Sequence, residues 1–360
     1  MLRRATAAGL FAVFSLAACS GRVTSVELTP VDGGAVDADA LDGADAARAP
    51  CTAKPGQFPA ANCELSENKC TPVRGCVIDE AKCGSASTCL PMKASSSTSV
   101  LDFRLRRLNV IAPPSLAYAT SPVVQTVLIN DSLSLNAKAC GELGKGSFNW
   151  LLRLDNEKGM ITTGGAPPSV DPFGSGYCFF DHAIGAIDVR PATVRARATA
   201  GGYESDAIAK LNMPIFLDNT GTSVILLPLS SAVLKNVAVS SDGSCIGAFN
   251  ASALDADCFE DLSTCSKWKT GGSVGAFISL EDADAIFIKE LNSSLCVLLT
   301  QSAPAKACPR DAAGKISARG DYCSTSQGPG ACADSSWFAA TFAASAVHVD
   351  DAAADPRCHR

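Results

Sequence analysis

The segment Leu101-Asp102-Phe103-Arg104-Leu105-Arg106 alternates apolar and charged side chains without a break. Because successive side chains of a β-strand point to opposite faces of a sheet, this period of two predicts a half-buried strand. The segment Val194-Arg195-Ala196-Arg197-Ala198 repeats the pattern with two further arginines. Both segments therefore predict strands with an apolar face toward a core and a charged face toward water.

Shorter apolar runs and turn signals surround these two segments. The runs that we expect to form further strands are Val123–Ile129, Phe148–Leu154, Pro214–Leu217 and Val224–Leu229. The turn signals between them are Gly164-Gly165, Pro167-Pro168, Gly174-Ser175-Gly176 and Gly201-Gly202. Many short strands with glycine and proline at the turns are typical of antiparallel folds. We therefore predict an antiparallel β-sandwich or jelly-roll over residues 98–240.

Residues 241–360 continue the mainly β pattern and carry eight cysteines, from Cys245 to Cys358. The runs Phe277–Leu280, Ala285–Ile288 and Leu295–Leu299 predict strands. The acidic start of Glu281–Leu291 also fits a short helix. Ser335–Val349 fits either an alanine-rich helix or a closing strand. We expect a disulfide-rich β region here.

Residues 51–89 form a separate cysteine-dense module with an internal repeat. Intervals of six, five, six and five residues separate five of its cysteines, Cys63, Cys70, Cys76, Cys83 and Cys89, and Cys51 completes the set. So short a segment with few large apolar groups needs disulfides to restrict its unfolded chain. A metal site is disfavoured because the chain has no CxxC pair and the module has no histidine.

The number of cysteines supports complete pairing. The chain has 17, and setting Cys19 aside leaves an even number. The cysteines that we predict to form disulfides are Cys51, Cys63, Cys70, Cys76, Cys83, Cys89, Cys140, Cys178, Cys245, Cys258, Cys265, Cys296, Cys308, Cys323, Cys332 and Cys358. Since Cys140 and Cys178 are the only two between residues 98 and 240, we predict that they pair with each other.

The first residues have the pattern of an export signal. Arg3 and Arg4 precede an uncharged, mostly apolar stretch, Ala5–Leu16, and Leu16-Ala17-Ala18-Cys19 follows. That tetrad resembles the lipobox of bacterial lipoproteins. The resemblance implies cleavage of residues 1–18 and acylation of Cys19 as a lipid anchor. An ordinary signal peptide is the alternative, but it would leave an odd thiol in an oxidising compartment.

The resemblance also implies a cellular location. In enterobacterial lipoproteins an Asp after the acylated cysteine favours the inner membrane, and here the residue is Ser20. We therefore expect a protein anchored to the outer membrane or displayed at the cell surface. Residues 19–50, with spaced aspartates among Ala and Gly, predict a flexible tether. This segment half resembles an EF-hand calcium loop, but Leu41 and Arg48 occupy ligand positions.

Composition excludes several classes of partner. The net charge is −6, and it becomes −8 when Arg3 and Arg4 leave with the signal, so nothing favours nucleic acid. No later stretch is long and apolar enough to predict a transmembrane helix. We expect membrane attachment through Cys19 alone.

Several phrases resemble uncharacterised secreted lipoproteins of GC-rich Gram-negative bacteria, over roughly residues 100–300. They are Phe148-Asn149-Trp150-Leu151-Leu152, Thr163-Gly164-Gly165-Ala166-Pro167-Pro168, Gly176-Tyr177-Cys178-Phe179, Cys245-Ile246-Gly247 and Ser294-Leu295-Cys296-Val297-Leu298-Leu299. This resemblance supports export and implies no known activity.

One motif fits a serine hydrolase. Gly271-Gly272-Ser273-Val274-Gly275 matches the GxSxG pattern, with Asp311 or Asp321 and then His348 downstream. A nucleophile elbow needs a strand before the serine and a helix after it. Here a polar segment precedes Ser273 and an expected strand follows it, so we favour a glycine-rich turn.

The remaining candidates favour structural roles. Asp181 and His182 are adjacent, and neighbours in a strand face opposite ways. The acidic groups Glu281-Asp282 with Asp284, and Asp155 with Glu157, fit turns and caps as well as glycoside hydrolysis or calcium binding. Three tryptophans, Trp150, Trp268 and Trp337, fit a core better than a sugar platform. We expect no cofactor and no metal.

Two functions follow from these expectations. The first is a non-enzymatic envelope lipoprotein with a structural role or with a glycan or protein ligand at the cell surface. The second is a secreted hydrolase that uses Ser273 with His348 or a carboxylate pair. The absence of a complete catalytic motif favours the first.

Overall fold

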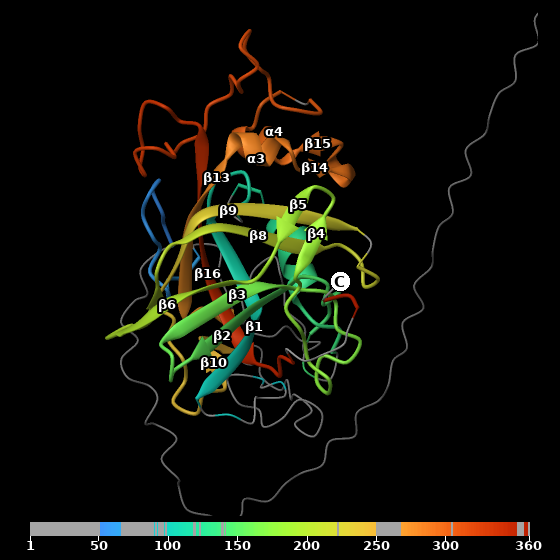
Figure 1. Ribbon diagram of the computed structural model, residues 1–360, viewed down its shortest axis with the longest axis vertical. Coiled ribbons are helices and arrows are strands. Elements are labelled where there is room, and N and C mark those ends of the chain that lie inside the picture. Colours follow the sequence, from blue (N-terminus) through green and yellow to red (C-terminus); the bar gives the residue numbers. More distant parts are fainter. Residues whose placement is uncertain are drawn as a thin grey trace, which may run out of the picture. The chain divides into compact units, whose positions relative to one another are not determined.

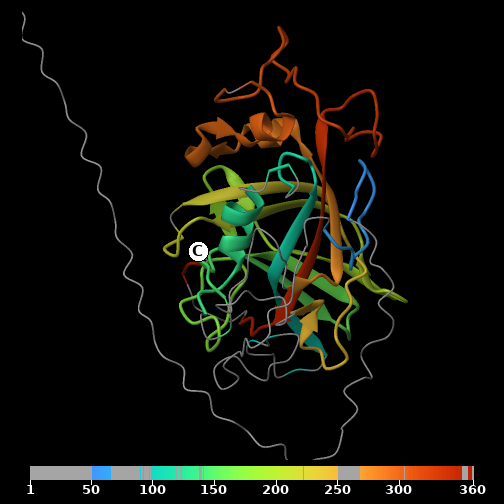
Figure 2. The same ribbon diagram turned by 180° about the vertical axis from the view of Figure 1, so that it is seen from behind.

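The computed structural model describes a mainly β protein (Figures 1 and 2). The described residues are 51–65, 90, 92, 97, 99–117, 120–121, 124–137, 140, 142–221, 223–249, 268–303, 305–350 and 356–358. Cys19, the tether, most of the cysteine repeat, Cys258 and Cys265 lie outside them. Within these ranges, no helix has the length and apolar character needed to cross a membrane.

One antiparallel sheet organises the chain. Its strands follow the order β7-β6-β3-β2-β1-β16-β13-β9-β8, and β10 pairs with β16. Their bounds are β1 Val100–Ala112, β2 Asn149–Asp155, β3 Met160–Ala166, β6 Ala192–Thr199, β7 Gly202–Ser205, β8 Ile208–Phe216, β9 Val224–Lys235, β10 Cys245–Ile246, β13 Gly272–Ser279 and β16 Ser335–Ala346. The two predicted β regions, 98–240 and 241–360, share this sheet because β16 and β13 lie between β1 and β9.

The sheet is strongly curled around an apolar core. Because of the curl, β3 and β6 lie against β8, although they stand far from it in strand order. Reciprocal hydrogen bonds of 3.0 Å between Tyr203 and Val237 join the β7 edge to the residues that follow β9. The mainly β, antiparallel prediction is confirmed, and its layers come from one sheet that folds over itself.

Strand β1 is central, and a bulge keeps its apolar side chains on one face. The sequence Leu105-Arg106-Arg107-Leu108 breaks the period of two, and the register with β16 shifts by one residue between Leu105 and Arg107. An extra residue in one strand restores the phase of the alternation. Phe103, Leu105, Leu108 and Val110 therefore all reach the core inside the curl.

Past Arg104, strand β1 no longer pairs with β2. A side chain from η2 (Val124–Asn130) forms hydrogen bonds with the edge of β1 that is left unpaired. The buried Gln125 amide accepts a hydrogen bond from Val110 N–H at 2.9 Å and donates to the Leu108 carbonyl at 2.7 Å. The element is a π-helix followed by α2 (Asp131–Leu133), so the strand predicted over Val123–Ile129 is wrong. A short apolar run that is buried has no period by which to tell strand from helix.

Two short helices and a hairpin lie beyond β8 and β9 at one end of the sheet, drawn in orange in both views (Figures 1 and 2). They are α3 Leu280–Asp284, β14 Phe287–Ile288, η5 Lys289–Leu291, β15 Ser293–Ser294 and α4 Leu295–Thr300. The strand predicted over Leu295–Leu299 is therefore wrong, and the helix alternative holds for the start of Glu281–Leu291. Serine side chains begin both helices, since Ser279 accepts from Asp282 N–H and Ser294 from Val297 N–H.

The last long element is β16, so the closing-strand alternative for Ser335–Val349 is the observed one. Two further small pairs complete the described elements. They are β4 His182–Ile184 with β5 Ile187–Val189, and β11 Ala248–Phe249 with β12 Trp268–Lys269.

Four disulfides join described cysteines. They are Cys51–Cys63, Cys178–Cys358, Cys296–Cys308 and Cys323–Cys332. The predicted Cys140–Cys178 pair is wrong, because Cys178 bonds to Cys358 near the end of the chain. Cys140 and Cys245 are disulfide-bonded as well. The number of cysteines predicted that they pair, and all ten described cysteines are disulfide-bonded, but the number could not choose their partners.

Candidate functional site

A cleft of about 810 Å³ opens where four separate segments meet. The start of β1 forms its floor with Leu101 and Asp102, and Ala346 at the end of β16 lies beside them. The tip between β6 and β7 and the link between β9 and β10 form its walls. We call this the hydroxyl-lined cleft, because its lining includes Ser97, Tyr203, Ser240, Ser241 and Ser244.

The two walls are held together by a close backbone contact. Gly202 has a φ of +120°, and a Cβ atom there would lie 2.3 Å from the Val237 carbonyl oxygen. Only glycine fits such a position. The hairpin tip can therefore approach the link between β9 and β10, and this approach defines the cleft.

The link presents a preformed carboxylate. The Ser240 and Ser244 hydroxyls each donate to Asp242 at 2.6 Å, and the Ser244 N–H donates to it at 3.1 Å. These hydrogen bonds, with the Ser240 hydroxyl contributing most, lower the pKa of Asp242 to about 2. Asp242 is exposed, so its carboxylate is charged and accessible at neutral pH.

The floor carries a second, closed carboxylate. Asp102 is buried and forms a two-point ion pair with Arg153. The Arg153 Nε atom lies 2.6 Å from Asp102 Oδ1, and the Arg153 Nη2 atom lies 3.1 Å from Asp102 Oδ2. Arg153 also donates to the Val349 carbonyl at 3.0 Å. Asp102 is thus committed to the fold, and Asp242 is the carboxylate available to a ligand.

An aromatic ring completes the cleft. Tyr203 is half-buried, packs on the core, and donates its hydroxyl to Asn156 Oδ1 at 3.0 Å. The described lining includes no histidine, cysteine, lysine or arginine. A fixed carboxylate, serine hydroxyls and a tyrosine suit hydrogen bonding to a polyhydroxylated molecule better than proton transfer.

The outward face of β1 carries a layer of buried charge. Arg106 and Glu142 form an ion pair of 2.5 Å with both side chains about 1% exposed. Arg106 Nε and Glu142 Oε1 have no hydrogen-bond partner in the described part of the chain. The Arg106 guanidinium also lies 5.0 Å from the centre of the Trp268 ring. The expected solvated face of this strand is therefore wrong, and segments distant in sequence cover it.

Arg104, on the same face, is satisfied by neutral acceptors. It donates to Asn149 Oδ1 at 2.6 Å and to the carbonyls of Leu133 and Phe148 at 2.8 and 3.2 Å. Burial lowers the pKa of Arg104, and burial likewise raises the pKa of Tyr177, whose ring lies 5.6 Å from that guanidinium. These groups tie the covering segments to β1 and have a structural role.

A second cleft, of about 650 Å³, lies at the helical end of the sheet. We call it the Lys306 cleft; its lining includes Ser121, Leu291, Val297, Leu298, Gln301 and Lys306. An apolar pocket of about 60 Å³ shares Leu298 with this cleft, and we call it the apolar void. The void is lined by Leu108, Val110, Leu116, Val124, Leu128, Ile129, Phe148, Ile215, Leu217, Ile225, Leu226, Leu227, Ile288, Leu295, Leu298 and Phe338.

The residues of the predicted serine site are dispersed. Ser273 is buried inside β13, where its hydroxyl donates to the Lys235 carbonyl at 3.3 Å. It pairs with Thr341 of β16, whereas Asp321 accepts from the N–H of Trp337. Four residues along a strand span roughly 13 Å. His348 lies beyond the other end of β16, so these groups form no triad.

The favoured glycine-rich turn at Ser273 is also wrong, because the motif lies in a strand. A Cβ atom on Gly272 would lie 2.4 Å from the Phe342 ring, and one on Gly275 would lie 2.5 Å from the Phe58 ring. Glycine in a strand lets another group approach the backbone closely. The motif therefore makes room for aromatic packing. Asp311 caps a local turn by accepting from the N–H groups of Ala313 and Lys315 at 2.9 Å.

The other sequence candidates are engaged in structure. Asp181 faces Arg190 at 3.7 Å, while the His182 ring lies 3.7 Å from the Phe180 ring, so they form no dyad with each other. The three tryptophans are buried, as the core interpretation predicted. Asp155 is paired with Lys158 at 2.8 Å.

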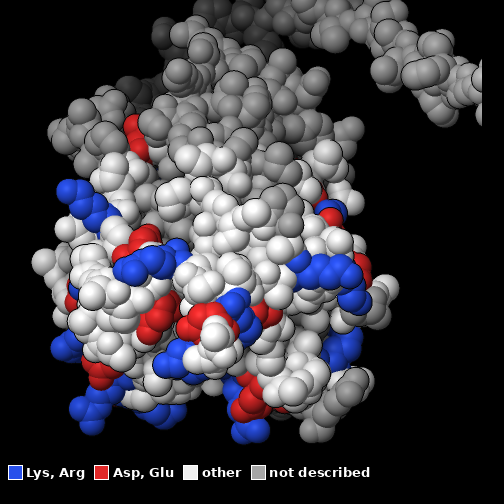
Figure 3. Space-filling view, turned by 90° about the horizontal axis from the view of Figure 1, so that it is seen from above, with Lys and Arg blue, Asp and Glu red and all other residues white. Residues whose placement is uncertain are grey.

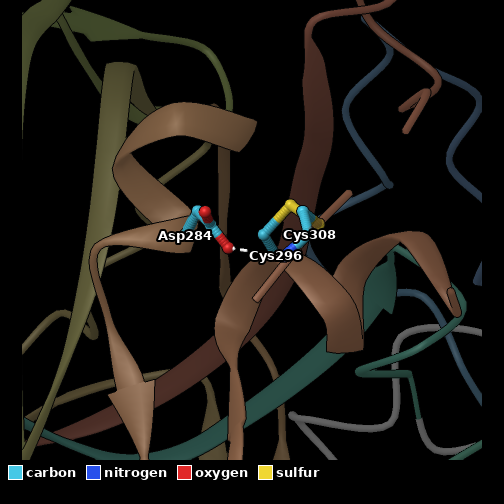
Figure 4. A group of neighbouring side chains, drawn as sticks. All are labelled: Asp284, Cys296 and Cys308. Carbon is cyan, nitrogen blue, oxygen red and sulfur yellow. Dashed lines mark hydrogen bonds between the residues drawn. A yellow bond between two sulfur atoms is a disulfide. The ribbon is translucent and has the colours of Figure 1, made fainter. Parts of the chain in front are cut away.

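The acidic group around α3 holds neighbouring segments together through Asp284 (Figure 4). Asp284 points toward the Cys296–Cys308 disulfide and accepts from the Cys308 N–H at 2.7 Å. It also accepts from the Ser294 hydroxyl at 2.8 Å and pairs with Arg310 at 2.8 Å. Burial raises the pKa of Asp284, but these hydrogen bonds outweigh it and leave the pKa lowered.

This cluster and the similar one at Cys323, Cys332 and Asp334 have the compactness of a metal site. The cysteines are oxidised to disulfides, however, and the thiolate is the form that binds metal. The surface above is charged with both signs interspersed, as Figure 3 shows. Ion pairs there join Glu281 to Arg310 and Asp282 to Lys210.

A comparison of the chain with known protein families finds no matching family, and comparisons with curated proteins and with solved structures find no significant match. The geometry of the clefts therefore carries the functional argument. Sequence reasoning missed Asp242, although the spacing Ser240-Ser241-Asp242-Gly243-Ser244 is a signal of a carboxylate held by neighbouring hydroxyls.

Proposed function

We propose that this protein is an exported, lipid-anchored envelope lipoprotein with a non-enzymatic role, and that its β domain binds a neutral saccharide in the hydroxyl-lined cleft. Cys19 holds the processed chain to the outer membrane or cell surface. The cleft then presents its ligand-binding groups outside the cytosol. The proposal keeps the glycan version of the function expected from sequence.

The observation that carries this proposal is the preformed carboxylate of Asp242 in the same cleft as the ring of Tyr203. A charged acceptor forms stronger hydrogen bonds with hydroxyl donors than a neutral acceptor does. Tyr203 offers an apolar ring with a polar tip, which suits the faces of a sugar ring. Because Ser240 and Ser244 already hold Asp242 in place, a ligand does not bear the entropic cost of ordering that carboxylate.

The proposed cellular location is supported by two independent features. The lipobox Leu16-Ala17-Ala18-Cys19 ends an export signal. Disulfides such as Cys178–Cys358 persist in oxidising compartments and are rare in the cytosol of mesophiles. Ser273, Asp321 and His348 lie apart, which favours the non-enzymatic role over a serine hydrolase.

A glycan array tests the binding proposal on the processed protein extracted in mild detergent. We expect binding to neutral oligosaccharides, and we expect Asp242→Asn to weaken it about tenfold, since a charged acceptor becomes neutral. Asp218→Asn is the matched control, because Asp218 also accepts from nearby backbone N–H groups of a loop, outside the cleft. Equal binding by both variants, or no binding by the native protein, would contradict the saccharide site.

Metabolic labelling with a palmitate analogue tests the anchor separately. We expect label on the native chain and none on Cys19→Ala, with intact mass showing loss of residues 1–18. An unlabelled native chain recovered in aqueous fractions would refute the anchor and leave the cleft argument standing.

A further inference from the structure

The Lys306 cleft and the apolar void share one lining residue. Leu298 of α4 lines both the 650 Å³ cleft and the 60 Å³ void. It is half-buried, and exposed or partly exposed side chains change rotamer quickly. A change of rotamer at Leu298 would join the two spaces. Among the described residues, only apolar side chains line the void, so an apolar group fits it and water does not.

Exposed apolar side chains occur on the elements that form the cleft and the void. Leu291, which lines the cleft, is 46% exposed, and Phe287 of strand β14 is also 46% exposed. Val127 of η2 is 48% exposed, and Val124 and Leu128 of the same element line the void. Each of these three exposed side chains belongs to an element that lines the cleft or the void.

The described lining of the cleft also contains one cation. Lys306 is exposed and forms no ion pair within the described ranges. The other polar groups of the lining include Ser115, Asn292 and Gln301, which are neutral. The described lining contains no carboxylate to repel an anion. The charge therefore favours a ligand with a negative head and an apolar body.

We propose that the Lys306 cleft binds a single-chain fatty acid. Its carboxylate lies at Lys306, its chain lies along Leu291, Val297 and Leu298, and its methyl end enters the void past Leu298. The site lies on elements other than those that form the hydroxyl-lined cleft, so it stands independently of the saccharide proposal.

Photo-crosslinking tests the site and its orientation. The probe is palmitic acid with a diazirine either at the methyl end or next to the carboxylate, and the protein is the full processed chain in phosphatidylcholine nanodiscs. We expect the methyl-end probe to label peptides that line the void and the carboxylate-end probe to label peptides that include Lys306. The reverse pattern, or label spread over the whole surface, would overturn the proposal.

Variants test the role of the cation. Lys306→Ala should reduce labelling about tenfold, because a charge-assisted hydrogen bond is lost, and Lys306→Arg should retain most of it. Lys315→Ala is the matched control, since Lys315 is also exposed but lies outside the cleft. Equal labelling of Lys306→Ala and Lys315→Ala would overturn the proposal. Labelling that appears only in a Cys19→Ala chain would also overturn it, because the occupant would then be the protein's own lipid.

Discussion

Strands β1 and β6 carry the same alternation of arginine and apolar residues, yet their arginines end in opposite environments. Arg104 and Arg106 of β1 are buried, whereas Arg195 and Arg197 of β6 are exposed. The difference lies in their places in the fold. β1 is central and covered by distant segments, while β6 stands next to the edge strand β7. An alternating pattern therefore identifies the strand and its inward face, but not what covers its outward face.

The difference also explains the hydroxyl-lined cleft. Buried charged side chains join β1 to the segments that cover its outward face. The same strand supplies Asp102 to the floor of the cleft. The exposed strand β6 leads into the hairpin tip that forms one wall. A rigid floor beneath a wall built from surface loops is a common arrangement for a binding site.

The largest expected effect comes from breaking the buried pair of β1. Arg106→Met leaves Glu142 charged and buried, so we expect a loss of about 3–5 kcal/mol in the free energy of unfolding. Arg195→Met, the matched change in β6, should stay within about 0.5 kcal/mol. Guanidinium unfolding with the disulfides intact measures both. Equal losses would erase the contrast between the strands. The double variant Arg106→Met/Glu142→Leu should recover most of the stability.

Arg104→Met should lower the free energy of unfolding by a smaller amount, about 2 kcal/mol. It leaves neutral acceptors without donors but leaves no buried charge unpaired. The acceptors are Asn149 Oδ1 and the carbonyls of Leu133 and Phe148. The same unfolding experiment checks it. A variant as stable as the native protein would show that the desolvation cost of this cation equals what its hydrogen bonds contribute.

A third test uses pH at the cleft wall. The folded-state pKa of Asp242 is about 2, below its ordinary value of 3.8, so its contribution to stability is present above pH 4 and is lost as pH falls toward 2. The native protein should therefore lose more stability than Asp242→Asn between pH 4 and about 2. Thermal unfolding across this range measures the difference. Parallel curves would mean that Asp242 is not held by its serines.

The smallest effect is expected for the exposed pair of β6. Arg197 lies 3.6 Å from Asp206, and their side chains are 69% and 49% exposed. Arg197→Ala should change the free energy of unfolding by less than about 0.5 kcal/mol, and added salt should not alter that result much. A loss above about 1 kcal/mol would show that β6 is also covered, contrary to the comparison.

Much of the sheet could be predicted from sequence, because alternation and turn residues are local signals. The strands at Leu101–Arg106, Val194–Ala198 and Phe148–Leu154 follow from them. The helix at Leu295–Leu299 was missed although Ser294, a common N-cap residue, precedes it. The apolar run outweighed the cap signal in the prediction.

The sites could not be predicted to the same degree, because they join residues that are far apart in sequence. Glu142 meets Arg106, and Cys178 meets Cys358, only after the chain has folded. The hydroxyl-lined cleft likewise combines Ser97 with Tyr203 and Asp242. No local pattern predicts such long-range contacts. The motif around Ser273 is local, but its glycines make room for aromatic packing and do not form a catalytic site.

Arginine modification of the native protein tests the contrast between β1 and β6 most directly. The protein is treated with phenylglyoxal and the modified residues are mapped by mass spectrometry, before and after denaturation. We predict rapid modification of Arg195 and Arg197 in the native state, and modification of Arg104 and Arg106 only after unfolding. Native-state modification of Arg104 or Arg106 at the rate of the β6 arginines would contradict the account.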